Sequence, residues 1–369
     1  MFYVVADKPG DIHRITIIVR SIPHSTPKGD AIYVSGDFNG WFPDVAEHKL
    51  KALPDGSYFV IITTHKRKFE YKFTRGTWNK SECINELKFT NRFIDLTLDP
   101  STTVYIDILN WEDKLHTASK FVKVLNDKFS IPQLNRERRI WIYLPPDYEE
   151  IPNKHYPVVY MQDGQNLFDN FYSYNIEWQI DKTLNFLHTS GLRVPIVVGT
   201  EHGGELRQNE YLPWKYKEIY GGEGDKYASF LAETLKPYID KNYRTLVDRD
   251  QNAIIGGDLG GLISLYTGMK YQHLFSKIAC FSAPFHNNPE IFEYVEKMGK
   301  RKELKFYFLA GLKEDDSKMK ISGNSRICEI LKIEGFTQEN IRSVVKYEGE
   351  QSELFWRREF QQAYRWLFL

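Results

Sequence analysis

The sequence is short of cysteine and has no excess of charge of either sign. Its three cysteines, Cys83, Cys280 and Cys328, are too few and too widely spaced for a disulfide framework or a cysteine metal site. Lysine plus arginine and aspartate plus glutamate number 49 each, so no net charge favours nucleic acid or an anionic membrane. We therefore expect reduced thiols, a cytoplasmic protein and no nucleic-acid partner.

Long apolar runs are also missing. No stretch approaches the ~18 apolar residues of a membrane span, and Met1–Lys8 lacks the basic and apolar regions of a secretory signal. What the chain does contain is 42% hydrophobic and 15% aromatic residues, which predicts substantial cores rather than disorder. A length of 369 residues is typical of two domains.

The pattern of residues changes near position 115. Up to about Trp111, short β-type runs separated by turn residues predict an all-β sandwich over residues 1–115. Over residues 116–369, strand-like runs alternate with helical segments, which predicts a doubly wound, largely parallel sheet. The expected strands of this second domain include 139–144, 157–161, 196–200, 253–256, 277–281, 305–310 and 343–347, and the expected helices include 227–241, 259–270 and 353–368.

Ile254–Leu262 has the form of a nucleophile elbow, the tight turn from a strand into a helix that carries the attacking residue of many hydrolases. Glycines flank its central residue because the turn leaves no room for side chains. That central residue is Asp258, not serine. We expect positive φ there, and we expect the helix N-terminus to favour the aspartate's negative charge.

The second domain resembles the esterase family related to enterochelin and feruloyl esterases, which have an α/β-hydrolase fold. The resemblance runs over residues 117–369, and its landmarks occur in order. They are Arg139–Tyr148, Tyr156–Phe168, Arg207–Tyr211, Leu235–Asp240, the elbow and Phe281–Pro284.

The resemblance implies a serine nucleophile, an acid and a histidine at three positions. In this sequence they are Asp258, Glu314 and Gln351, so only the acid is kept. Acyl transfer needs a hydroxyl activated by an imidazole that later returns the proton. Glutamine cannot carry that proton, and the last histidine, His286, precedes the acid. The sequence therefore predicts a catalytically inactive pseudoesterase that needs no cofactor.

Three alternatives remain open for this site. Asp258 could attack as a carboxylate, or orient water, with His202 or His286 as base. Glu201, His202 and Asp258 could hold a metal ion, although no ligand spacing supports it. Asp258 could also be only a helix cap.

If the site is inactive, the backbone N–H groups of Leu259 and Gln165, which the resemblance places in an oxyanion hole, would face the Asp258 carboxylate. That carboxylate would repel anions and accept a small neutral ligand such as a sugar. We expect the ligand pocket to include Glu201, His202, Arg207 and His286.

The first domain resembles the starch- and glycogen-binding module of glucan-active enzymes, an immunoglobulin-like β-sandwich. The resemblance is carried by Gly36–Trp41, Phe69–Trp78 and Thr90–Arg92. It implies a sugar platform of Trp41 and Trp78, with Lys72 and Asn91 bonding hydroxyl groups; flat aromatic faces suit the C–H faces of sugars. Alternatively, the tryptophans pack in a core or between domains, with Arg75 and Glu82 in a polar interdomain contact. If the tryptophans do bind sugar, we expect the whole protein to be a glycan-binding pseudoesterase or a carbohydrate-binding scaffold.

Overall fold

The computed structural model describes residues 12–83, 91–97, 103–174, 176–217 and 219–369. Contacts between Cα atoms divide the chain into two compact units. The first unit comprises residues 1–117 and 170–175, and the second comprises residues 118–169 and 176–369. The start of the chain, where we expect no secretory signal, and Thr90 of the sugar-binding resemblance lie outside the described residues.

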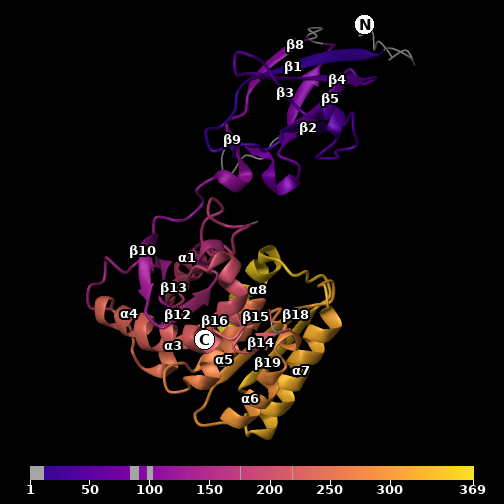
Figure 1. The fold of residues 1–369 in the computed structure, drawn as a ribbon. Helices are drawn as coiled ribbons and strands as arrows, with labels where there is room; N and C mark the ends of the chain where they lie inside the picture. Colours follow the sequence, from indigo (N-terminus) through magenta and orange to yellow (C-terminus); the bar gives the residue numbers. More distant parts are fainter. Residues whose placement is uncertain (1–11, 84–90, 98–102, 175, 218) are drawn as a thin grey trace. The chain divides into compact units, whose positions relative to one another are not determined.

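The first unit is built from short β-strands around one core (Figure 1). One sheet has the order β3-β4-β1-β8 and another β2-β5-β7, and a third pairs β6 with β9. Alternate residues point inward: Ile15, Ile17 and Val19 from β1 meet Phe69 and Phe73 from β5 in the shared core. The strands are β1 (His13–Ser21), β2 (Tyr33–Gly36), β3 (Lys51–Ala52), β4 (Tyr58–Thr64), β5 (Lys68–Thr74), β6 (Glu82–Cys83), β7 (Arg92–Asp95), β8 (Thr103–Asp107) and β9 (Asn110–Trp111). The unit's assignment to the immunoglobulin-like class stays a prediction.

The second unit has an eight-stranded sheet with the order β10-β11-β13-β12-β16-β17-β18-β19. The strands from β13 to β19 in this order are parallel, whereas β11 is antiparallel to both β13 and β10. The strands are β10 (Val122–Ile131), β11 (Arg136–Tyr143), β12 (Val158–Gln162), β13 (Ile196–Thr200), β16 (Asn252–Gly257), β17 (Lys277–Phe281), β18 (Lys305–Gly311) and β19 (Ile341–Lys346). A separate hairpin joins β14 (Lys215–Tyr216) and β15 (Tyr220–Gly221).

Helices cover both faces of this sheet, so the predicted doubly wound arrangement is confirmed (Figure 1). One face packs against α1 (Ile180–Thr189) and α8 (Glu353–Phe368). The other packs against α2 (Arg207–Tyr211), α3 (Gly224–Ser229), a π-helical turn (Phe230–Leu235), α4 (Lys236–Asn242), α5 (Leu259–Lys270), α6 (Glu290–Met298) and α7 (Ser317–Ile333). Short 3-10 turns lie at Ala46–His48, Trp78–Lys80, Glu112–Lys114, Gly164–Asn166, Gly204–Leu206, Arg249–Gln251 and Phe285–Asn287.

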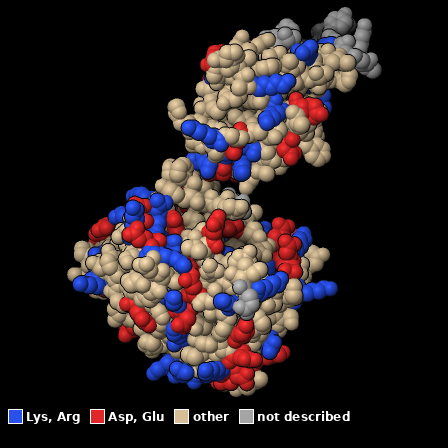
Figure 2. All heavy atoms as spheres, in the orientation of Figure 1, with Lys and Arg blue, Asp and Glu red and all other residues tan. Residues whose placement is uncertain are grey.

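The distribution of charged side chains and the state of the cysteines agree with the expectations from the amino-acid composition. On the face shown in Figure 2, basic and acidic side chains are interspersed over each unit. Cys83, Cys280 and Cys328 are buried and free, as expected. No helix of the described residues is both long and apolar enough to cross a membrane.

Candidate functional site

The predicted catalytic positions gather where the parallel strands of the second unit end. Because the carboxyl ends of parallel strands lie at one edge of a sheet, residues from distant parts of the sequence meet there. The residues that follow the strands are Asp163 after β12, Glu201 and His202 after β13, Asp258 after β16, Ser282 after β17, Glu314 after β18 and Gln351 after β19.

The elbow has the strained backbone that its sequence predicts. Asp258 has φ 54° and ψ −130°, a conformation that residues with side chains rarely adopt. A Cβ on Gly256 would lie 2.2 Å from the carbonyl oxygen of Gly260, so the turn requires glycine there. Asp258 is the N-cap residue of α5, as the helix-cap interpretation expects, but its side chain makes no capping hydrogen bond to that helix.

Both carboxylate oxygens of Asp258 are engaged by other side chains. Arg207 Nη1 donates to Oδ2 at 3.0 Å, and Gln351 Nε2 donates to Oδ1 at 3.0 Å. The same guanidinium donates to both carboxylate oxygens of Asp163, at 2.8 and 2.9 Å. Burial alone would lower the pKa of Arg207, but Asp163 and Asp258 hold this pKa well above its usual range. Arg207 therefore compensates part of the negative charge at the nucleophile position, because Asp163 shares the same guanidinium.

A lysine stands between Gln351 and the acid. Lys320 Nζ from α7 donates to Gln351 Oε1 and lies 3.3 Å from Glu314 Oε2. The side chain of Lys320 is 4% exposed and that of Glu314 is fully buried. The remaining oxygen of Glu314 accepts hydrogen bonds from Ser282 Oγ and from the Gly311 N–H, both at 2.6 Å. Glu314 thus lies at the acid position of the family, but it pairs with the ammonium group of Lys320 and not with a histidine.

These contacts form one chain in which the neutral amide of Gln351 joins two sets of opposite charges: Asp163, Arg207, Asp258, Gln351, Lys320 and Glu314. In a serine hydrolase the histidine passes a proton between nucleophile and leaving group while the acid orients it. Here the amide of Gln351 joins a carboxylate to an ammonium and has no proton to exchange near neutral pH. The geometry therefore holds charges in place without supplying a general base at Gln351.

The two predicted histidines lie at the same edge, but neither is hydrogen-bonded to Asp258. His202 Nδ1 accepts from the Gly204 N–H at 2.9 Å, and burial lowers the pKa of His202. Burial also lowers the pKa of His286, with Asp258 acting in the opposite direction. Nδ1 of His286 is buried and has no hydrogen-bond partner. Burial therefore disfavours the protonated form of both imidazoles.

The metal alternative is not supported. Among the described residues, no group of three or more His, Cys, Asp or Glu side chains could hold a metal ion. Glu201, one of the three suggested ligands, accepts a hydrogen bond from Trp141 Nε1 at 2.8 Å and lies 3.6 Å from Arg139. Its carboxylate is thus engaged away from Asp258.

The two residues of the implied oxyanion hole follow neighbouring strands. Leu259 is the first residue of α5, and Gln165 lies in the turn Gly164–Asn166 after β12. These segments approach closely, since a Cβ on Gly260 would lie 3.1 Å from Asp163 Oδ2. The side chain of Gln165 accepts a hydrogen bond from the His202 N–H at 3.3 Å.

In the first unit, the structure brings the two tryptophans together but buries the lysine. The rings of Trp41 and Trp78 lie 6.0 Å apart at 44°, and Trp78 is 41% exposed. Lys72 is only 7% exposed, and its charge acts on half-buried Glu112. The amide of Asn91 donates to Glu70 at 2.8 Å.

Arg75 and Glu82, suggested for an interdomain contact, form ion pairs within the first unit. The Arg75 side chain is 1% exposed and pairs with Asp30 and Asp113 of the same unit. Glu82 accepts from the guanidinium of Arg92 at 2.8 Å. Both charges are therefore satisfied within the first unit.

Sequence reasoning missed three residues of the site: Asp163, Ser282 and Lys320. The first two directly follow β12 and β17, so their position after a parallel strand was the available signal. Lys320 gave no such signal, because it lies on α7, a helix absent from the sequence prediction. Glycine, serine and asparagine in the middle of α7 are weak helix formers.

Comparisons with known proteins agree with this architecture. The family described as "Putative esterase" matches residues 131–367. The uncharacterized protein YbbA of Bacillus subtilis (strain 168) is 26% identical over 243 residues, which cover 63% of this chain and 92% of that protein. The crystal structure of enterochelin esterase from Shigella flexneri matches with a TM-score of 0.55 at 13% identity, covering 97% of this chain and 93% of that one. A ferulic acid esterase structure matches with a TM-score of 0.51 at 21% identity, covering 67% and 98%.

Proposed function

This chain belongs to the "Putative esterase" family of α/β-hydrolases, and we propose that its second unit is a pseudoesterase that binds a ligand without cleaving it. One observation carries the proposal: both oxygens of the Asp258 carboxylate are engaged, by Arg207 and by Gln351. A nucleophile needs a free lone pair and a base that renews it after each turnover. Asp258 keeps free lone pairs, because a carboxylate offers about four acceptor sites, but its two hydrogen bonds weaken it as a nucleophile and Gln351 supplies no base.

The contacts around Lys320 support the same proposal. In a working triad the acid pairs with the histidine and stabilises the charge that forms on it. In this chain Glu314 already faces the ammonium of Lys320, 3.3 Å away. The acid position therefore serves charge compensation in the buried part of the site.

The charges also favour a neutral ligand. Asp163 and Asp258 share one guanidinium, so a second anion would meet two carboxylates at close range. Gln351 is exposed and the Asp258 side chain is 23% exposed, so hydroxyl groups of a ligand could exchange hydrogen bonds with both. We propose a small polyhydroxylated molecule as the ligand class.

The test is an esterase assay on short acyl nitrophenyl esters with a graded set of variants. The natural protein and the double variant Asp258→Ser/Gln351→His should show no sustained turnover. In both, Lys320 remains paired with Glu314, so this carboxylate cannot orient a histidine at position 351. Adding Lys320→Met frees Glu314 for the introduced imidazole, and this triple variant should turn over. A matched control replaces Lys320→Met with Lys313→Met, which removes a lysine from an exposed pair with Glu348. Sustained turnover by the natural protein that Asp258→Asn abolishes would contradict the proposal.

A second candidate function is a working hydrolase with Asp258 as the attacking or water-orienting carboxylate. The observation in its favour is the buried, unpartnered Nδ1 of His286, which lies within electrostatic reach of Asp258. Under this mechanism His286→Gln abolishes turnover of the natural protein, and His202→Gln does so if His202 is the base. If the natural protein has no turnover, neither His286→Gln nor His202→Gln changes the rate, and this second candidate is contradicted.

For the first unit we propose glycan binding, on the ground that Trp41 and Trp78 are paired and Trp78 is exposed. Affinity electrophoresis in soluble glucans checks this. Trp78→Ala should abolish the retardation of the natural protein, whereas Trp111→Phe, in the core, should not. Binding that survives Trp41→Ala/Trp78→Ala would contradict a tryptophan platform. Because Lys72 is buried, Lys72→Met should leave the affinity unchanged.

A further inference from the structure

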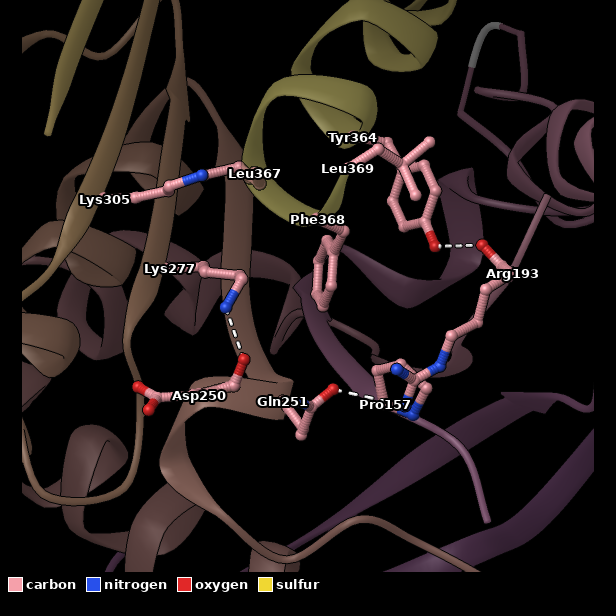
Figure 3. A pocket seen from close by; sticks show the side chains of 10 residues that line it. All are labelled: Pro157, Arg193, Asp250, Gln251, Lys277, Lys305, Tyr364, Leu367, Phe368 and Leu369. Atoms are coloured by element: carbon pink, nitrogen blue, oxygen red, sulfur yellow. Dashed lines mark hydrogen bonds between the residues drawn. The ribbon is translucent and has the colours of Figure 1, made fainter. Parts of the chain in front are cut away.

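A pocket of about 280 Å³ opens at the edge of the sheet opposite to Asp258 (Figure 3). Its lining residues lie where strands of the second unit begin. Lys277 and Lys305 are the first residues of β17 and β18, Pro157 precedes β12 and Gln251 precedes β16. The end of α8 closes one side with Tyr364, Leu367 and Phe368. No part of the site at the carboxyl ends contributes to this pocket.

Three cations line the pocket, and their hydrogen bonds go to uncharged groups. Lys277 Nζ donates to the main-chain oxygen of Asp250, and Lys305 Nζ donates to the main-chain oxygen of Trp366 at 3.3 Å. The guanidinium of Arg193 donates to the side-chain oxygen of Gln251 at 3.2 Å. Within the described ranges, none of these three cations forms an ion pair with a carboxylate.

The one acidic side chain in the lining, Asp250, offsets these charges only in part. The carboxylate of Asp250 accepts from Arg249 Nη1 at 2.7 Å and is 69% exposed. Burial lowers the pKa of Lys277 to about 8; the charge of Asp250 opposes this shift, and the charges of Lys305, Arg249 and Arg193 act in the same direction as burial. Lys277 therefore lies among three other cations and one carboxylate, and a bound anion would compensate charge that Asp250 leaves unbalanced.

An aromatic ring completes the pocket. Lys277 Nζ lies 5.1 Å from the centre of the Phe368 ring, and Figure 3 shows that ring between Lys277 and Arg193. One face of this ring stacks on Tyr364, with 5.1 Å between the ring centres, so the apolar surface that it offers a ligand is its other face and its edge, beside Lys277. Pockets that hold small molecules combine an apolar wall with a few placed polar groups, and they begin near roughly 300 Å³.

We propose that this pocket binds a small organic anion, whose phosphate or carboxylate group is held by Lys277, Lys305 and Arg193 and whose flat apolar part packs on Phe368. The proposal does not depend on the function proposed for the Asp258 site.

Isothermal titration of the whole chain at low ionic strength tests the proposal, with phenyl phosphate, benzoate, inorganic phosphate and phenol as probes. Phenyl phosphate should bind more tightly than inorganic phosphate, because only the former reaches Phe368, and phenol should not bind. Tighter binding of phenyl phosphate than of benzoate identifies a phosphate as the preferred group, and the reverse order identifies a carboxylate. Failure of both aromatic anions to bind overturns the proposal.

Variants locate the binding. Lys277→Met and Lys305→Met should each weaken the affinity about tenfold, as expected for loss of one charge-assisted hydrogen bond. Lys277→Arg should keep most of the affinity, and Lys241→Met, an exposed lysine on α4 outside the pocket, should not change it. Lys305→Met provides the result if Lys277→Met does not fold. Equal affinities for Lys305→Met and Lys241→Met would overturn the assignment.

Discussion

The two edges of the second unit's sheet differ in how their charges are satisfied. At the carboxyl ends of the strands, Arg207 pairs with Asp163 and Asp258, and Lys320 pairs with Glu314. At the amino ends, Lys277, Lys305 and Arg193 donate to uncharged carbonyl, hydroxyl and amide oxygens.

This difference bears on function. A site whose groups satisfy one another has little electrostatic free energy left for a transition state, because catalysis relies on groups aimed at charge that develops in the reaction. Cations without counter-ions keep that free energy available for a ligand. The charges at the edge that carries the catalytic positions are therefore largely paired with one another. The cations at the opposite edge have no carboxylate partner among the described residues, so that edge attracts an anion more strongly.

The largest expected effect comes from breaking the buried pair at the carboxyl edge. Lys320→Met leaves the fully buried carboxylate of Glu314 without a counter-ion. Removal of one partner from a buried ion pair costs about 3–5 kcal/mol of the free energy of unfolding. Urea unfolding at neutral pH measures this loss. Glu314→Gln in the Lys320→Met background should recover much of it, because the uncompensated charge is gone.

An exposed ion pair, Lys313 with Glu348, provides the control for the buried pair of Lys320 with Glu314. Lys313 and Glu348 are also paired, but their side chains are 48% and 66% exposed. Such surface pairs contribute about 0–1 kcal/mol, so Lys313→Met should change stability little. Equal losses for Lys313→Met and Lys320→Met would contradict the role assigned to burial.

The next effect comes from the arginine that joins two carboxylates. Arg207→Met leaves Asp163 and Asp258 close together without compensation, and it should cost about 2–3 kcal/mol because the group is partly exposed. Arg207→Lys keeps the charge but not the fork, so it should cost less. Urea unfolding compares them. Asp258→Asn should restore part of the stability lost in Arg207→Met, and a further loss instead would contradict the shared-counter-ion account.

At the amino edge the expected effect is smaller and depends on pH. The pKa of Lys277 is about 8 in the folded protein against the ordinary 10.5. Between these values the unfolded chain binds more protons, so the stability of the natural protein rises with pH. Below pH 8 the folded protein bears the full cost of the buried ammonium. Lys277→Met removes this cost and should be about 1–2 kcal/mol more stable near pH 7, a gain reduced for solvent screening.

The measurement is urea unfolding of both proteins at about pH 7 and about pH 9.5, either side of the folded pKa. The difference between the two proteins should shrink as the pH rises. A difference that stays constant with pH would show that packing, not charge, separates Lys277→Met from the natural protein.

The sequence predicted much of the fold because the signals there are local. The elbow at Asp258 was predicted from its glycines, and α5 and α8 have the predicted bounds, Leu259–Lys270 and Glu353–Phe368. Strand β10 was missed, since it is an edge strand with many charged and polar residues and lacks a buried alternating pattern.

The part of the site that could not be predicted depends on contacts between distant residues. Glu314 and Gln351 were placed by family resemblance, but no spacing rule joins them to Lys320. The partners of Arg207 likewise come from β12 and β16, far apart in the sequence. A charge network that crosses several loops has no sequence period, so only the assembled sheet reveals which charge neutralises which.

The smallest expected effect tests whether the carboxyl edge acts as one network or as two separate pairs. Gln351 is exposed and uncharged, and it joins Asp258 to Lys320. Each of those charges keeps its opposite partner in Gln351→Met, so the loss of stability should be about 0.5–1 kcal/mol. Urea unfolding compares it with Gln362→Met, an exposed change on α8 that should be neutral. A loss for Gln351→Met as large as that for Lys320→Met would show that the amide couples the two pairs. Restoring a triad would then require the whole chain of charges to be rebuilt, because the acid and the nucleophile position could not be changed independently.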